Sequence, residues 1–254
     1  MDSEFLRDAI TQRLFVISDP QFGSQVVFDW VPQRRAFGHI DHLHRALVDN
    51  WNAVVGADDY VLCLGDFTQN LKDSHASMTL VEKYTGLLNG RKLLIRGNHD
   101  AEVTPWYYDC GWNCLIEYPL VLEGDTMRWL PSPTPYGGCL ICEVDGQRIL
   151  FSHFAIHEGE HDDPRYLVEK AHLRELFNHF ECDLNVHGHT HIRPVDHPRC
   201  LSACVETTGF KPLRIGDFLR RHIGDSDRAH NGKRAADPLS LGFAVHGETI
   251  AEAV

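Results

Sequence analysis

The chain has 254 residues, of which 24% are charged and 43% hydrophobic, and its formal net charge at pH 7 is −12. This composition predicts a soluble globular protein with one large domain or two small ones, and the acidic charge disfavours an extended nucleic-acid surface, which needs a basic face. No run approaches ~18 consecutive apolar residues, so the sequence predicts no membrane-spanning helix.

The first half of the chain alternates apolar runs with amphipathic segments. We interpret the segment through Trp30 and Arg35, which is polar and aromatic, as a loop. Helical periodicity appears over residues 40–51 and again around residues 81–88, before a stop at Gly90. Buried strands are predicted at residues 14–17, 61–64 and 93–95. The resulting β-α-β-α-β order predicts parallel strands joined by helices.

The second half begins with short strands from about Leu115. Residues 141–144 and 148–151 flank Asp145-Gly146, which predicts a hairpin. Asp163-Pro164 predicts a helix start. The helix that follows carries apolar residues at helical spacing and leads into a strand from Leu184. We expect one domain over residues 1–225 and a polar tail over residues 226–254.

The eight cysteines and the N-terminus bear on the compartment of the protein. The stretch from Met1 to Arg13 is mixed and charged and does not resemble a signal peptide, which predicts a cytoplasmic protein with reduced cysteines. The cysteines lack the paired C-x-x-C repeat of zinc ribbons, so we interpret them as structural thiols. The close pairs are Cys110 with Cys114, Cys139 with Cys142, and Cys200 with Cys204.

Five apolar strands end in polar residues of the same kinds. Ligands of open α/β sheets gather outside the carboxyl ends of the strands, so these residues are candidates for one site. In His187-Gly188-His189-Thr190-His191 the alternation predicts imidazoles on one side of an extended segment. The full set is Asp19 and Gln21, Asp66, Asn98 and His99, His153, and His189 with His191.

The chemistry of this set indicates metals. Carboxylate, carboxamide and imidazole groups without thiolate suit Mn, Fe or Zn. The ligands exceed the needs of one ion, so two divalent metals that share a bridging carboxylate fit better. Two bound cations would make the site locally positive despite the acidic chain, so a phosphate ester can enter.

The ordered motifs D-x-(H/Q), G-D, G-N-H-D, S-H and G-H-x-H resemble those of the calcineurin-like metallophosphoesterase superfamily. A branch of small bacterial phosphoesterases is the most similar, through residues 17–24, 50–52, 88–100 and 205–212. The resemblance covers roughly residues 14–219. It implies an α/β fold, a two-sheet α/β/β/α sandwich with mixed sheets.

The resemblance also implies roles for individual residues. Asp66 would bridge the two metals, and His99 would be the acid that protonates the leaving oxygen or binds the phosphoryl group. The remaining ligands of the first metal would be Asp19, Gln21 and His191, and those of the second Asn98, His153 and His189. Gln21 stands where most members of the family have a histidine. Gln69 stands where the serine/threonine phosphatase branch has an aspartate that supports the catalytic histidine, which argues against a protein phosphatase.

The sequence thus predicts a binuclear, manganese-dependent phosphoesterase that hydrolyses a small phosphomono- or phosphodiester through a metal-bound hydroxide. Gln21 resembles a D-x-Q variant of ADP-ribose diphosphatases, so hydrolysis of a nucleotide diphosphate is one alternative. A non-hydrolytic phosphate-binding protein is another. We expect Asp100 to be a helix N-cap and His187 to pack near the site. Solvated loops are expected to hold Arg35, Arg96, His157, His161 and Arg193.

Overall fold

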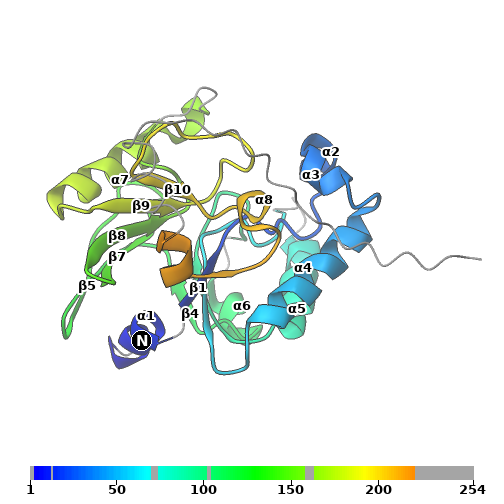
Figure 1. Cartoon of the computed structure of the whole chain (residues 1–254), viewed down its shortest axis with the longest axis horizontal. Helices are drawn as coiled ribbons and strands as arrows, with labels where there is room; N and C mark the ends of the chain where they lie inside the picture. The colour runs from blue at the N-terminus through cyan, green and yellow to red at the C-terminus, as the bar shows by residue number, and fades with distance from the viewer. Residues whose placement is uncertain (1–2, 13, 70–73, 102–103, 158–162, 221–254) are drawn as a thin grey trace, which may run out of the picture.

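The computed structural model describes residues 3–12, 14–69, 74–101, 104–157 and 163–220. Within them the chain forms two β-sheets that pack against each other, with helices on the outer sides (Figure 1). The predicted tail, residues 226–254, and His161 lie outside the described residues. No described helix combines the length and apolar character that crossing a bilayer requires. All eight cysteines are free thiols.

The helices are α1 (Ser3–Gln12), α2 (Gln25–Trp30), α3 (Pro32–Arg35), α4 (Ile40–Val54), α5 (Ser74–Leu87), α6 (Thr104–Asp109), the 3₁₀ helix η1 (Pro164–Tyr166), α7 (Leu167–His179) and α8 (Val205–Thr208). The strands are β1 (Leu14–Ile17), β2 (Tyr60–Cys63), β3 (Arg91–Ile95), β4 (Cys114–Ile116), β5 (Pro119–Glu123), β6 (Thr126–Trp129), β7 (Cys139–Val144), β8 (Gln147–Ser152), β9 (Leu184–His187), β10 (Cys200–Ser202) and β11 (Leu213–Arg214).

Both sheets are mixed, as predicted. The first has the order β11-β1-β2-β3-β4, in which β1 to β4 are parallel and β11 is antiparallel. The second has the order β10-β9-β8-β7-β5-β6, and β8 lies parallel to β9. The predicted hairpin is present, with Val144 opposite Gln147 and positive φ at Asp145 and Gly146, the backbone of a type I′ turn.

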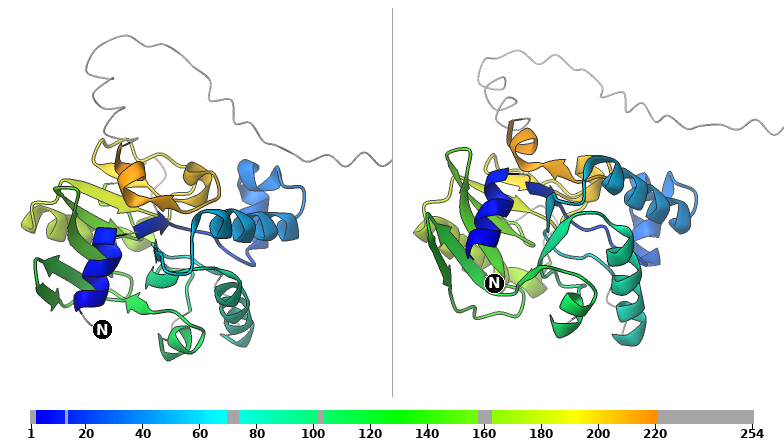
Figure 2. Two further views of the ribbon diagram at one scale, coloured as in Figure 1. Left: turned by 60° about the horizontal axis from the view of Figure 1, so that its bottom comes forward. Right: turned by 90° about the horizontal axis from the view of Figure 1, so that it is seen from below.

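The alternation of side chains along each strand produces the layers. Leu14 and Val16 of β1 belong to the core between the two sheets, whereas Phe15 and Ile17 point to the opposite face, which α4 and α5 cover. The outer face of the second sheet packs against α7. Two further views show α4 and α5 on the side of the molecule opposite α7 (Figure 2). The predicted α/β/β/α sandwich is therefore confirmed.

The loop interpretation of the segment through Trp30 and Arg35 is wrong, because the structure has α2 and α3 there. These helices have 6 and 4 residues, too few for a hydrophobic period to show in the sequence. Local signals support them nevertheless. The Ser24 side chain accepts a hydrogen bond from Val27 N at the start of α2, and Pro32 stands in the first turn of α3.

One buried histidine of α4 is expected to make the fold sensitive to acid. His44 Nε2 accepts a hydrogen bond from Gly23 N (3.1 Å), and its Nδ1 lies 2.9 Å from the Tyr84 hydroxyl. Because Nε2 accepts a backbone N–H, the ring is neutral, and protonation would break this bond. Burial, helped by the charges of Lys83 and Arg34, lowers the pKa of His44 to about 4.

In the unfolded chain this histidine has a pKa near 6.5 and binds a proton at a higher pH than in the folded protein. The free energy of unfolding should therefore fall as the pH drops from about 6.5 to about 4. We expect this loss to be on the order of 1 kcal/mol at pH 5, after allowance for solvent screening. Urea unfolding in chelator at pH 7 and pH 5 measures it. His44→Gln, which keeps an acceptor and a donor, should lose less stability on acidification, and an equal loss would contradict the assignment.

Candidate metal centre

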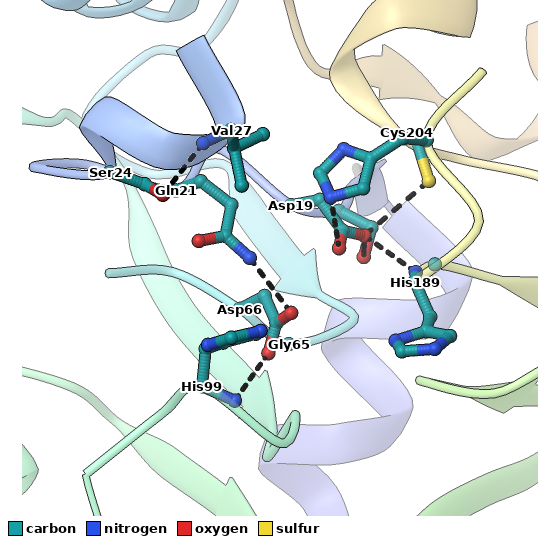
Figure 3. A network of polar contacts seen from close by, with 12 residues as sticks. Asp19, Gln21, Ser24, Val27, Gly65, Asp66, His99, His189 and Cys204 are labelled. Carbon is teal, nitrogen blue, oxygen red and sulfur yellow. Dashed lines mark hydrogen bonds and ion pairs between the residues drawn. The ribbon is translucent and has the colours of Figure 1, made fainter. Parts of the chain in front are cut away.

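Loops after strands of both sheets meet at one place. In the first sheet, Asp19 N, after β1, donates to Gly65 O, after β2 (3.0 Å). In the second, Gly188 N, after β9, donates to His153 O, after β8 (3.0 Å). His189 N joins the two sheets by donating to Asp19 Oδ2 (2.8 Å) (Figure 3). These bonds bring residues that are far apart in the sequence into one cluster.

Three of the predicted ligands of the second metal form one group. Single ligand atoms of Asp66, His153 and His189 all lie within 4.8 Å of one another. His153 Nδ1 donates to Leu64 O (2.8 Å), so in the neutral ring Nε2 presents a lone pair. That lone pair faces Asn98 Oδ1 at 3.0 Å and Asp66 Oδ1 at 3.6 Å. Acceptor atoms that face one another in this way fit a cation.

Two of the predicted ligands of the first metal, Asp19 and His191, face each other. Asp19 Oδ1 is 3.7 Å from His191 Nε2. Asp19 Oδ1 and Gln21 Oε1 are buried, and no described residue donates a hydrogen bond to either. Asp19 Oδ2, in contrast, accepts from Ser18 Oγ (2.6 Å) and Cys204 Sγ (3.4 Å). Buried acceptors without a donor are costly, and a cation beside each atom would offset this cost.

The Asp66 carboxylate contacts candidate ligands of both predicted metal positions. Its Oδ1 accepts from His99 N and its Oδ2 from Gln21 Nε2, both at 2.8 Å (Figure 3). Each carboxylate oxygen receives one N–H and keeps a further lone pair. This arrangement suits a carboxylate that is shared by two cations.

The expectation that Asp100 caps a helix is wrong, because α6 begins only at Thr104. Asp100 is buried and accepts hydrogen bonds from Asp66 N, Phe67 N and Gly97 N, all at 2.8 Å. It therefore fixes the loops after β2 and β3 relative to each other. Burial and the charge of Asp66 raise the pKa of Asp100 to about 7.

The backbone of the candidate ligands is left-handed at five positions. Such φ values cost L-residues roughly 1–2 kcal/mol each. The prediction of an extended His-x-His-x-His segment is wrong, because His189 and His191 have left-handed and not extended backbone. His187 ends β9, buried beside the backbone, and left-handed residues then send the next two imidazoles to different partners. The five residues are Asp19 (φ 57°), Gln21 (φ 53°), Asp66 (φ 53°), His189 (φ 65°) and His191 (φ 49°).

Two glycines allow the close approach of these loops. A Cβ atom on Gly97 would overlap Asp66 Oδ1 and the His153 ring. One on Gly188 would overlap the side chains of Ser18 and Asp19. Only glycine permits the loops to approach to these distances.

A family model described as calcineurin-like phosphoesterase matches residues 12–193. The chain belongs to the calcineurin-like phosphoesterase family. The resemblance seen in the ordered motifs is thereby confirmed. The family supports hydrolysis of phosphoesters as the general activity and divalent metals as the cofactor class, and the cluster of Asp66, His153 and His189 agrees with both.

The individual relatives support the fold, but neither of them has a known activity. The uncharacterised protein MJ1445 of Methanocaldococcus jannaschii is 33% identical over 89 residues, which are 35% of this chain and 47% of that protein. The chain thus spans about half the length of this curated relative. The crystal structure of AQ665, a protein of unknown function from Aquifex aeolicus, superposes with a TM-score of 0.57 and 24% identity. The alignment covers 84% of this chain and 98% of that one.

The two histidines of the phosphoesterase H-x-H motif differ in their electrostatics. Burial, with the nearby rings of His153 and His191, lowers the pKa of His189 well below its usual value. Burial alone would also lower the pKa of His191, but the hydrogen bond to Glu206 and the charge of Asp19 raise it above its usual value. His189 is therefore neutral and can bind a cation directly. His191 is protonated in a larger fraction of molecules, and in those molecules a cation must first displace the proton.

Arg34 and Glu206 form a buried ion pair beside the site, and no sequence pattern had predicted a role for either residue. Burial alone would raise the pKa of Glu206, but the Arg34 guanidinium and the hydrogen bond from His191 lower it to about 2. Residues 205–212, one of the stretches that resemble the family, contain Glu206 and were its only signal in the sequence. Arg34 lies in the segment interpreted as a loop, so nothing distinguished it from Arg35.

The expected solvated loops hold for only some of their residues. Arg35 is exposed, as expected, but it lies in α3 and not in a loop. Arg96 instead forms an ion pair with Glu117 (2.8 Å) and is mostly buried. Arg193 is exposed and lies in a loop, as expected, with its guanidinium over the Trp30 ring. The ring of His157 stacks on that of His197, with ring centroids 3.6 Å apart.

Proposed function

We propose that the protein is a cytoplasmic, binuclear metal-dependent phosphoesterase that acts on a small phosphomono- or phosphodiester. The observation that carries the proposal is the Asp66 carboxylate, which belongs to one group with His153 and His189 and whose other oxygen accepts from Gln21 Nε2, while Asp19 and His191 face each other nearby in the fold. Carboxylate, amide and imidazole donors together favour Mn²⁺, with Fe²⁺ and Zn²⁺ as alternatives.

When bound, the two cations would act as Lewis acids toward the phosphoryl group and make water a nucleophile at neutral pH. The protein holds the ligands in place before metal binds, through the hydrogen bonds to Asp66, Asp19 and His153. His99 is the proposed proton donor to the leaving oxygen. Its backbone N–H is fixed on Asp66 Oδ1, and no described residue hydrogen-bonds to its ring, which leaves the ring for the substrate.

A metal-supplemented activity screen tests the function. The purified protein is incubated with Mn²⁺ and with aryl phosphomonoesters, linear and cyclic phosphodiesters, and nucleotide diphosphates. We expect Mn²⁺-dependent turnover of a mono- or diester that chelator abolishes. Protein that binds Mn²⁺ and phosphate but turns over no substrate would instead be a non-hydrolytic binding protein, and the proposal would be wrong.

Two aromatic side chains favour a nucleotide diphosphate as a second candidate substrate. Trp30 is 41% exposed, lies edge-on to His191 (centroids 5.8 Å apart) and carries the Arg193 guanidinium over its ring. Tyr166 lies edge-on to His189 on the other side of the site (5.5 Å). Stacking of a base on such a ring contributes ~1–3 kcal/mol. A higher kcat/KM for ADP-ribose-like substrates than for aryl diesters in the same screen would favour this candidate.

Gln21 should be the weak point of the first metal position. Its carboxamide is a neutral donor that is harder than imidazole, so it should cost affinity, more for Zn²⁺ than for Mn²⁺. Its Nε2 is also committed to Asp66 Oδ2, which leaves only Oε1 for a cation. We expect Gln21→His to reduce the excess Mn²⁺ needed for full rate. Metal titration of activity measures this, with Gln25→His on the exposed side of α2 as the control. Superimposable curves for Gln21→His and the native protein would contradict it.

A further inference from the structure

A fully buried ion pair lies directly behind the first metal position. Arg34 Nε donates to Glu206 Oε1 at 2.6 Å, and each side chain is 1% exposed. The two residues are 172 positions apart in the sequence, on α3 and α8. Removing two charges from water costs several kcal/mol per ion, and a buried pair often stabilises a fold no better than apolar residues would. Stability is therefore a poor explanation for the pair.

The other contacts of Arg34 reach the loop after β1. Its Nη2 donates to Asp19 O (2.6 Å) and its Nη1 to Pro20 O (3.1 Å). These carbonyls belong to the segment in which Asp19 and Gln21 have left-handed backbone. Arg34 thus holds a strained loop in the conformation that presents both side chains to the site.

The other contact of Glu206 reaches the ring of His191. His191 Nδ1 donates to Glu206 Oε1 (3.1 Å), while Nε2 points toward Asp19 Oδ1 (3.7 Å). A carboxylate that accepts the Nδ1 proton fixes the tautomer in which Nε2 carries the lone pair, and it makes that nitrogen a better donor. α8 is itself tied to the site, because Val205 N donates to Ser18 O (3.0 Å).

We propose that Arg34 and Glu206 are positioning residues that assemble the first metal position and leave the second independent. Glu206 orients His191, and Arg34 neutralises Glu206 and fixes the backbone of Asp19. Two ligands of the second position have supports of their own, namely Leu64 O for His153 and His99 N for Asp66, whereas His189 N donates to Asp19 Oδ2. The inference rests on the proposed binuclear site, but it makes a separate claim about selectivity between its two positions.

Metal binding to the metal-free protein tests the proposal without any activity measurement. Native protein titrated with Mn²⁺, followed by calorimetry and by the electron paramagnetic resonance of free Mn²⁺, should bind two ions. Glu206→Gln should lose about 10–100-fold in affinity for one ion and keep the other. His191→Ala identifies the affected ion, since a Glu206→Gln/His191→Ala double variant should lose little more than His191→Ala alone. Equal weakening of both ions in Glu206→Gln would overturn the proposal.

A second variant separates positioning from folding. Arg34→Met/Glu206→Leu replaces the pair with apolar side chains of similar size, which keeps such cores folded. We expect its urea unfolding without metal to resemble that of the native protein, while its first ion binds as weakly as in Glu206→Gln. Native affinity for both ions in this variant would show that the pair is merely structural. If native protein binds two ions but hydrolyses nothing, the proposed function fails and the positioning role stands. If it binds none, both fail.

Discussion

Asp66→Asn should abolish the binding of both metals and reduce activity to the background of the assay. The native side chain offers two anionic oxygens, of which one accepts from His99 N and the other from Gln21 Nε2. Asparagine keeps one side-chain oxygen, and its NH₂ group takes the place of the other. That NH₂ group would face the N–H of His99 or of Gln21, which would then lack an acceptor. Losing a charged partner inside a buried site costs about 3–5 kcal/mol, equivalent to roughly 10²–10⁴-fold in affinity.

Elemental analysis of protein purified without chelator measures this effect. We expect between one and two transition-metal equivalents in the native protein and almost none in the variant. Asp145→Asn is a matched control, because Asp145 is an exposed aspartate with φ 50°, close to the 53° of Asp66, so the same exchange is made in a similar backbone conformation. Metal retained at native levels in Asp66→Asn would remove Asp66 from the centre.

His99→Asn should keep the metals and lower kcat by ~10²–10⁴-fold if the ring is a general acid. The backbone N–H that holds Asp66 is unchanged by the substitution, so the metal sites should persist. A proton donor matters less when the leaving group is already a stable anion. The loss should therefore shrink along a series of aryl esters with increasingly acidic phenols.

The slope of log kcat against the pKa of the leaving group is the measurement that decides the role of His99. A steeper slope in the variant than in the native enzyme indicates proton donation. Parallel slopes would mean that His99 binds the phosphoryl group without donating a proton. His42→Asn, on the exposed side of α4, controls for nonspecific effects of the exchange.

The architecture could be predicted because it follows from local patterns. Apolar runs of four residues mark β1 and β2, and Asp145-Gly146 marks the hairpin between β7 and β8. The ordered motifs at the strand ends then indicated the family. The shortest elements could not be predicted, because α3 has 4 residues and β11 has 2. These are too few for a hydrophobic period to be visible in the sequence.

The residues that organise the site from behind could not be predicted for a different reason. Arg34 and Glu206 meet only through the fold, and Asp100 acts by accepting three backbone N–H groups. Every residue except proline has a backbone N–H, so these donors cannot be recognised from the sequence. The φ values of His189 and His191 are likewise set by their surroundings, so alternation alone gave the wrong conformation for that segment.

The left-handed backbone at the candidate ligands has a consequence for how this family diverges. At Asp19, Gln21, Asp66, His189 and His191 a glycine would be conformationally easier than the residue present. Selection for chemistry then opposes drift toward glycine or asparagine at these sites. Relatives that have lost catalysis should accumulate those residues here first, while their buried strands stay unchanged. A glycine at one of these positions would thus distinguish an inactive descendant from an enzyme. A redesign that selects only for stability would introduce the same substitutions.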